Sequence, residues 1–135
     1  MNPRLVIDAS AAICWASPDE APPITLADAI ARGGCIAQAL WIYEVHNALL
    51  ILHQRQRLDT DGYAAACMAL AALGVELETP TWQSVGHDVL RLAGAHGLTV
   101  YDAAYLELAL RQRLPLASFD QQLRKAATAE GLALV

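Results

Sequence analysis

Short apolar runs alternate along this chain with longer segments in which apolar residues recur at helical spacing. Each run covers only a few positions, which favours a strand over a helix. Alternating strands and helices are the sequence form of β-α units around a mostly parallel sheet, so the predicted fold class is α/β. Strands are predicted over residues 5–7, 35–37, 75–77 and 116–118, and helices over 10–15, 26–31, 41–57, 62–73, 81–95, 102–113 and 121–130.

Two segments invite more specific expectations. The Ala-rich stretch over residues 63–75 carries no charge and is shorter than the ~18 residues that cross a bilayer, so it is predicted to be a buried helix. Residues 132–135 are apolar again and are expected to close the sheet at one edge. We therefore predict a well-packed core and no membrane association.

The composition indicates one globular domain over residues 1–135. Hydrophobic residues make up 56% and charged residues 17% of the 135 positions, without repeats or low-complexity tracts. The apolar run at the N-terminus is interrupted by Asp8, so we expect no signal peptide and a cytoplasmic protein. The three cysteines lack a Cys-x-x-Cys pair and are predicted to be buried free thiols.

Four acidic residues lie where a parallel sheet places its ligand site. Asp8 directly follows the run over residues 5–7, and Asp120 comes just after the run over residues 116–118. Asp102 stands at the start of a predicted helix, and Glu44 in the first turn of another. Ligands of such sheets bind outside the carboxyl ends of the strands. We expect all four carboxylates at that end.

Clustered carboxylates repel one another unless a cation neutralises them. A ligand set made only of oxygens suits Mg²⁺, with Mn²⁺ as the alternative. Ser10 and Ser118 each lie two residues from an Asp and could hold a carboxylate or a metal-bound water by hydrogen bonds. Asn47, one turn after Glu44, could hold that carboxylate or contact the substrate, and it could equally be an ordinary surface residue.

Each aspartate also has a purely structural interpretation, because aspartate near a helix start caps the helix and complements its dipole. Asp102 could cap the helix that begins beside it, and Asp8 could end its strand in a polar turn. Asp120 could complement a helix N-terminus within a capping box formed by Ser118 and Gln121. The sequence leaves both interpretations open. Glu44 is less easily explained in this way, since apolar residues surround it in the sequence.

At this point the chain resembles the PIN domain family and, within it, the VapC-type toxin ribonucleases of bacterial toxin–antitoxin systems. The resemblance lies in four spaced motifs whose order and spacing match the family. The last motif has Ser118 where Thr is common, a change that keeps the hydroxyl. The motifs are Leu5–Ser10, Glu44–Leu49, Leu98–Tyr105 and Ser118–Asp120.

The resemblance implies a three-layer α/β/α sandwich with a parallel sheet and a metal-dependent ribonuclease. It implies that Asp8 and Asp102 are the principal metal ligands and that Glu44 and Asp120 complete the acidic cluster. The products would carry 5′-phosphate and 3′-hydroxyl ends. The implied partners are an RNA substrate, a cognate antitoxin protein and a second protomer in a homodimer. The residues implied to support the cluster are Ser10, Asn47 and Ser118.

Two other functions remain open on the sequence. A PIN-like binding module would keep the fold without catalysis. A Mg²⁺-dependent aspartyl-phosphate domain would use Asp8 as nucleophile, but Ser10 stands where such phosphatases carry a second Asp, and Lys125 is the only lysine.

The net charge of −5 does not exclude RNA, because ten acids remain against nine bases once the four candidate ligands are set aside. The basic residues considered for phosphate contacts, none with an assigned role, are Arg55, Arg57, Arg111, Arg113, Arg124 and Lys125.

Overall fold

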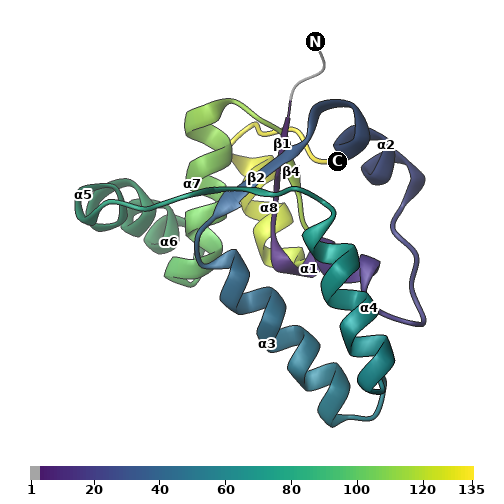
Figure 1. Ribbon diagram of the computed structural model, residues 1–135. Coiled ribbons are helices and arrows are strands. Elements are labelled where there is room, and N and C mark those ends of the chain that lie inside the picture. Colours follow the sequence, from purple (N-terminus) through teal and green to yellow (C-terminus); the bar gives the residue numbers. More distant parts are fainter. Residues whose placement is uncertain (1–3) are drawn as a thin grey trace.

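The computed structural model describes residues 4–135, so the first three residues of the predicted domain range lie outside it. A four-stranded sheet in the order β3-β2-β1-β4, with every pair parallel, forms its centre (Figure 1). The strands are β1 (Leu5–Ile7), β2 (Cys35–Gln38), β3 (Glu76–Glu78) and β4 (Leu116–Ala117). The helices are α1 (Ala9–Ala12), η1 (Ile13–Trp15), α2 (Ile24–Gly33), α3 (Trp41–Gln54), α4 (Thr60–Ala71), α5 (Trp82–Ser84), η2 (Val85–Val89), α6 (Leu90–His96), α7 (Val100–Gln112) and α8 (Gln121–Ala129).

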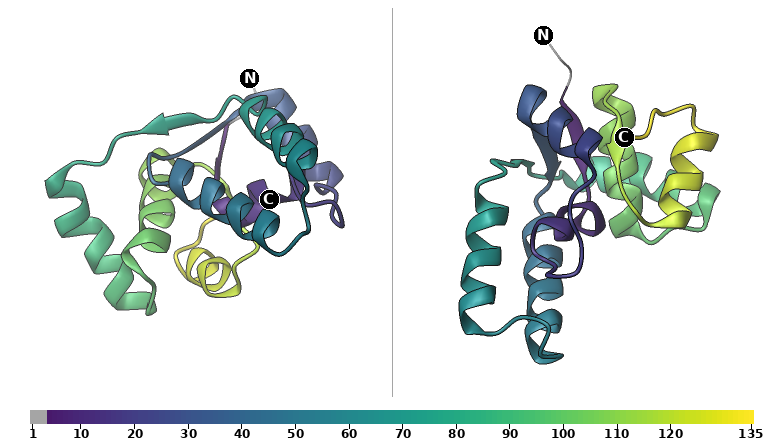
Figure 2. Two further views of the ribbon diagram at one scale, coloured as in Figure 1. Left: turned by 60° about the horizontal axis from the view of Figure 1, so that its bottom comes forward. Right: turned by 90° about the vertical axis from the view of Figure 1, so that its right-hand side faces the viewer.

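Helices cover both faces of the sheet, which confirms the predicted α/β class. Figure 2 shows α3 and α4 on one side of the strands and α6, α7 and α8 on the other. Strand β1 is completely buried between β2 and β4, as expected for a central parallel strand made only of apolar residues. Helix α7 packs on β1, β2 and β4, and a continuous run of its residues, 103–109, is buried.

The strand order creates a topological switch point beside β1. The chain passes from β1 to β2 and β3 in one direction and then returns to place β4 on the other side of β1. Open α/β sheets bind ligands at such a switch point, outside the carboxyl ends of the strands, and here the segments after β1 and β4 are joined by hydrogen bonds. Leu134 pairs in parallel with Leu116, so the predicted closure of this edge by residues 132–135 is confirmed.

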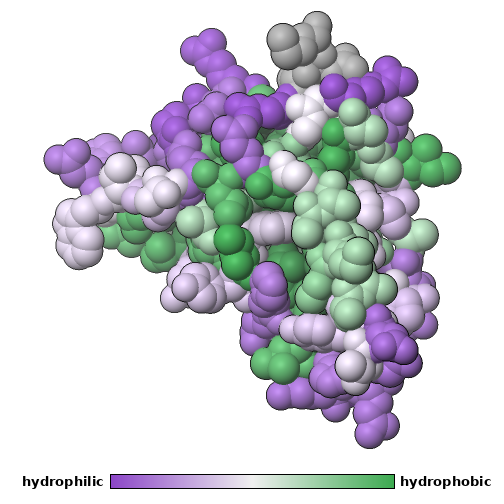
Figure 3. Space-filling view, viewed as in Figure 1, coloured by the Kyte–Doolittle hydropathy of each residue, from purple (hydrophilic) through white to green (hydrophobic). Residues whose placement is uncertain are grey.

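The prediction that the stretch over residues 63–75 forms a buried helix is wrong in its burial. In α4 only Ala66 and Leu70 are buried, and Met68 is 74% exposed. The helix packs through one side against α3 and η1, and its other side faces solvent. Hydrophobic residues gather on this part of the surface in the space-filling view (Figure 3). Exposed alanines cost little because each offers a small apolar area.

Smaller differences concern the cysteines and the helix predicted over residues 81–95. Cys14 and Cys35 are buried free thiols as predicted, whereas Cys67 on α4 is only partly buried. The predicted helix is divided into α5, a π-helical segment and α6, and Thr81 caps it from outside. None of the helices described between residues 4 and 135 is both long and apolar enough to span a bilayer.

Candidate active site

Asp8 leaves the carboxyl end of β1 and is the N-cap of α1. Its side chain is 4% exposed and accepts three hydrogen bonds. The Ser10 hydroxyl donates to Oδ1 over 2.7 Å and the Ala11 N–H donates to the same oxygen over 2.9 Å, while the Ser118 hydroxyl donates to Oδ2. These donors hold a buried carboxylate in a defined orientation at the switch point.

Ser118 links the ends of the two strands. It is buried directly after β4, and its hydroxyl oxygen accepts the Asp120 N–H over 3.1 Å while donating to Asp8. Asp120 in turn caps α8, because its Oδ1 accepts the Leu123 N–H over 2.9 Å. The hydroxyl predicted to support the cluster therefore touches one acid and fixes the backbone of another.

Asp102 lies in the first turn of α7 but does not cap it. The cap is Thr99, whose hydroxyl accepts the Asp102 N–H over 3.1 Å, so α7 begins two residues earlier than predicted. The interpretation of Asp102 as a cap is therefore wrong. Asp120 lies at a helix N-terminus as predicted, but it is itself the cap, so the predicted capping box that begins at Ser118 does not form. Asp8, predicted to end its strand in a polar turn, caps α1. Capping and metal binding do not exclude each other, since each carboxylate has more lone pairs than a cap requires.

Glu44 projects from the first turn of α3 and is half-buried. Its Oε1 accepts a 2.5 Å hydrogen bond from the hydroxyl of Tyr105, a residue that is only 1% exposed. The sequence alone assigns Tyr105 no role. Its signal is its position three residues after Asp102, on the same face of α7, together with the need of a buried tyrosine hydroxyl for a partner.

The four carboxylates influence one another electrostatically. Burial raises the pKa of Asp8 and the pKa of Asp102, and the charge of Asp120 raises both further. Burial also raises the pKa of Glu44, against the lowering effect of the Tyr105 hydrogen bond, and the charges of Asp102 and Asp8 add to the rise. The charged forms of Asp8, Glu44 and Asp102 are thus disfavoured by lost hydration and by their acidic neighbours.

Within residues 4–135, no Lys, Arg or His side chain forms an ion pair with a carboxylate of this cluster. The salt bridges in this range involve other acids. Oxygen donors with raised pKa values and without a cationic partner fit a hard divalent ion. In this conformation, however, no group of three or more His, Cys, Asp or Glu side chains in that part of the chain is arranged to hold a metal ion.

Hydrogen bonds from protein donors hold the carboxylates of Asp8 and Glu44 in this conformation. Both oxygens of Asp8 are engaged by protein donors, and Glu44 is turned toward Tyr105. Asp102 and Asp120 extend from separate helices, α7 and α8.

Asn47 does not hold Glu44 by a hydrogen bond in the described structure. It lines a cavity of about 410 Å³ beside Glu44 instead, together with Leu40, Tyr43 and Tyr101. Of the roles that the sequence left open for Asn47, the structure does not show the hydrogen bond to Glu44 and leaves the side chain exposed beside the cavity.

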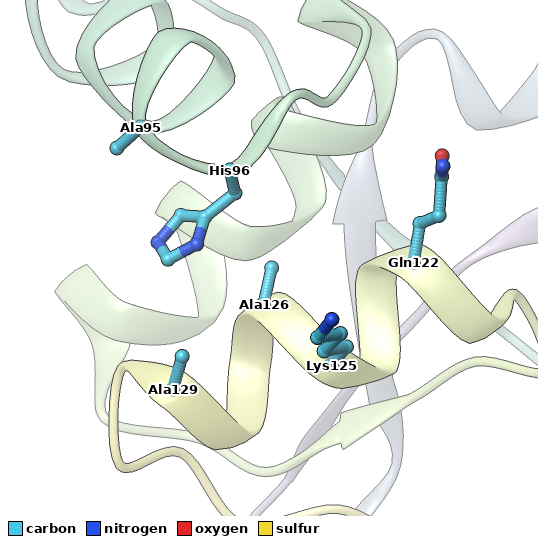
Figure 4. Close-up of a pocket in the computed structure, with 6 residues that line it drawn as sticks. All are labelled: Ala95, His96, Gln122, Lys125, Ala126 and Ala129. Carbon is cyan, nitrogen blue, oxygen red and sulfur yellow. The ribbon is translucent and has the colours of Figure 1, made fainter.

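A second cavity, of about 320 Å³, lies apart from the acids between α6 and α8 (Figure 4). It is lined by His96, Gln122, Lys125 and three alanines. No candidate acid takes part, so the only lysine does not lie where an aspartyl-phosphate domain would need it. This placement counts against that alternative.

The basic residues considered for phosphate contacts fall into distinct groups. Arg57 pairs with Asp19, and Arg111 pairs with Glu78 and Glu107. Arg124 donates to the backbone oxygen of Ser118 over 2.9 Å, which places its guanidinium beside the candidate site. Arg124 is therefore the basic residue best placed to approach a phosphate there.

Replacing Ser118 with alanine is expected to lower the free energy of unfolding by about 1.5–3 kcal/mol at neutral pH, because a buried carboxylate loses a charge-assisted donor. Ser118→Thr keeps the hydroxyl and is the matched control, expected to lose much less. Denaturant unfolding of both variants measures the difference. Equal stability of Ser118→Ala and wild type would show that this hydrogen bond does not support Asp8.

Comparison with known proteins agrees with this geometry. The family model described as PIN domain matches residues 5–129, a range that contains all four acids. Among solved structures, the chain is similar to the crystal structure of PAE2754 from Pyrobaculum aerophilum, with 28% sequence identity and a TM-score of 0.69 over 93% of this chain and 81% of that one. No curated protein matches. The chain belongs to the PIN domain family, whose members are generally nucleases that use divalent metal ions.

Proposed function

We propose that the chain is a Mg²⁺-dependent endoribonuclease that hydrolyses RNA phosphodiester bonds and leaves 5′-phosphate and 3′-hydroxyl ends, with Mn²⁺ as the alternative ion. The observation that carries the proposal is the proximity of four carboxylates at the switch point, none of which forms a salt bridge with a basic side chain among residues 4–135. That arrangement is unfavourable for stability and suits a divalent ion and a phosphate.

The protein's own groups have distinct tasks in this proposal. Asp8 and Asp102 would hold the ion, and Glu44 and Asp120 would complete its surroundings. Ser10 and Ser118 orient Asp8, and Tyr105 orients Glu44, through the hydrogen bonds already described. A bound divalent ion supplies activation of water and stabilisation of the charge that develops on the phosphate and the leaving oxygen. No nucleophilic side chain is required.

We further propose that the protein is the toxin of a toxin–antitoxin pair, acts in the cytoplasm and forms a homodimer. The motifs that resemble VapC-type toxins support this role. An antitoxin would cover the site with a basic side chain that meets the acids. Exposed apolar side chains on α3 and α4 support the existence of a protein partner; Leu50 is 45% exposed and Met68 is 74% exposed.

The test is expression of the full chain in a bacterium, followed by mapping of new 5′-phosphate RNA ends. Asp102→Asn is the informative variant, because Asp102 caps no helix and its side chain can lose its charge without removing a cap. Asp61→Asn, in the first turn of α4, is the matched control. Discrete new ends are expected with wild type and Asp61→Asn only.

Ends that also form with Asp102→Asn would contradict the assigned site. Absence of new ends with folded wild-type protein, and of cleavage of total RNA by purified protein in Mg²⁺, would favour the PIN-like binding module.

A further inference from the structure

The cavity beside Glu44 is flanked by two tyrosines that are unusually exposed. Tyr43 is 81% exposed and Tyr101 is 64% exposed, and both line the cavity with Leu40, Glu44 and Asn47. Each tyrosine directly precedes one of the candidate acids in the sequence. The first turns of α3 and α7 therefore present an aromatic ring and a carboxylate side by side.

Neither tyrosine is used by the fold. The only pair of aromatic rings in contact among residues 4–135 is His53 with Tyr63, so Tyr43 and Tyr101 have ring faces that no other ring covers. Neither hydroxyl makes a hydrogen bond within that part of the chain, in contrast to the buried Tyr105. Large exposed rings that serve neither packing nor hydrogen bonding mark a surface for binding.

The rest of the cavity has the character of a small-ligand site. Its volume of about 410 Å³ falls in the range of such pockets, and its lining is mainly apolar. Asn47 adds an amide that can both donate and accept a hydrogen bond. A flat apolar ligand with polar edges matches this combination, since rings can stack on its faces while the amide meets its edge.

We propose that this cavity binds an unpaired nucleobase of the substrate RNA next to the scissile phosphate, with Tyr43 and Tyr101 stacking on the base and Asn47 contacting its edge. The proposal rests on the ribonuclease function proposed above. Proteins recognise single-stranded RNA by stacking splayed bases on aromatic side chains, which paired bases in a duplex cannot offer.

The test measures binding of short fluorescent RNAs in Mg²⁺ by anisotropy, in the Asp102→Asn background so that the RNA stays intact. The probes are single-stranded homopolymers of adenosine and of uridine, and a ribose-phosphate chain of equal length without bases. Base stacking is worth about 1–3 kcal/mol, so Tyr43→Ala and Tyr101→Ala should each weaken binding of the homopolymers by about 5- to 150-fold.

Matched variants separate stacking from other effects. Tyr43→Phe and Tyr101→Phe keep the rings and should bind within about twofold of the parent protein. Trp82→Ala removes a ring that is 94% exposed on α5, outside the cavity, and should change nothing. The ribose-phosphate probe without bases should bind weakly, and with the same affinity to all variants. Asn47→Ala should reduce the difference in affinity between the adenosine and the uridine homopolymers.

Several outcomes would overturn the proposal. The tyrosine-to-alanine variants could bind the homopolymers as tightly as the parent does while wild type cleaves RNA. This result would contradict the base-binding pocket and leave the proposed ribonuclease function intact. In that case the exposed tyrosines belong to a protein-binding surface. If the tyrosine-to-alanine substitutions weaken binding of the ribose-phosphate probe without bases to the same extent, the rings do not contact bases. If wild type neither binds nor cleaves RNA, both the ribonuclease function and the base-binding pocket are contradicted.

Discussion

Purified Asp102→Asn protein is expected to cleave RNA at least about 100-fold more slowly than wild type in Mg²⁺ and yet to be no less stable in EDTA. A ligand to a catalytic ion contributes several kcal/mol to transition-state stabilisation, and each 1.36 kcal/mol corresponds to about tenfold in rate. The pKa of Asp102 is raised by burial and by the charges of Asp120 and Asp8, so its ionised form opposes folding. Asparagine removes that charge at nearly constant shape.

The size of the stability effect is small because Asp102 is only half-buried and solvent screens its neighbours. A favourable interaction of roughly 0.3–1 kcal/mol between a first-turn carboxylate and the helix dipole is lost at the same time. Asp61→Asn loses this dipole interaction without relief from neighbouring acids, so it should be slightly less stable than wild type and fully active. Cleavage assays and thermal unfolding in EDTA measure both properties. A clear loss of stability in Asp102→Asn would mean that the carboxylate supports the fold.

The parts of the molecule that follow from local pattern could be predicted from the sequence. The run Leu5–Ile7 is short, continuous and apolar, and it forms the central buried strand. Asp8 and Asp120 follow apolar runs that become neighbouring strands, so their meeting at one end of the sheet follows from parallel topology. The α/β class depended only on alternation and was confirmed.

Features that depend on packing between distant segments could not be predicted. The hydrogen bond from Tyr105 to Glu44 joins α7 to α3, and neither helix reveals its partner in its own periodicity. The Ala-rich helix α4 has apolar residues on all sides, so its sequence could not show which side would face solvent. Thr99 and Asp102 are both suitable caps three residues apart, and the choice of Thr99 fixed the start of α7.

A divalent ion is expected to stabilise the wild-type protein strongly near neutral pH and less in acid. At about 100 times its dissociation constant, an ion that binds only the folded state adds about 2.7 kcal/mol. For a domain of this size that raises the melting temperature by roughly 10 °C. The gain requires ionised carboxylates, so it should be large at about pH 7.5 and smaller at about pH 4.5, because carboxyl groups with raised pKa values take up protons at a higher pH than usual.

In the metal-free protein, the contribution of the acidic cluster to the free energy of unfolding should depend on pH in the opposite direction. Asp8, Glu44 and Asp102 have pKa values above the ordinary 3.8 for Asp and 4.5 for Glu, so the folded state holds their protons more tightly than the unfolded chain. Their contribution to the free energy of unfolding therefore decreases as pH rises from these ordinary values through the raised ones. Differential scanning fluorimetry in Mg²⁺, Mn²⁺ and EDTA across this window checks both slopes, with NaCl at equal ionic strength as the control. An ion-induced increase in melting temperature that is the same at about pH 7.5 and about pH 4.5, or that persists in Asp102→Asn, would place the ion outside the acidic cluster.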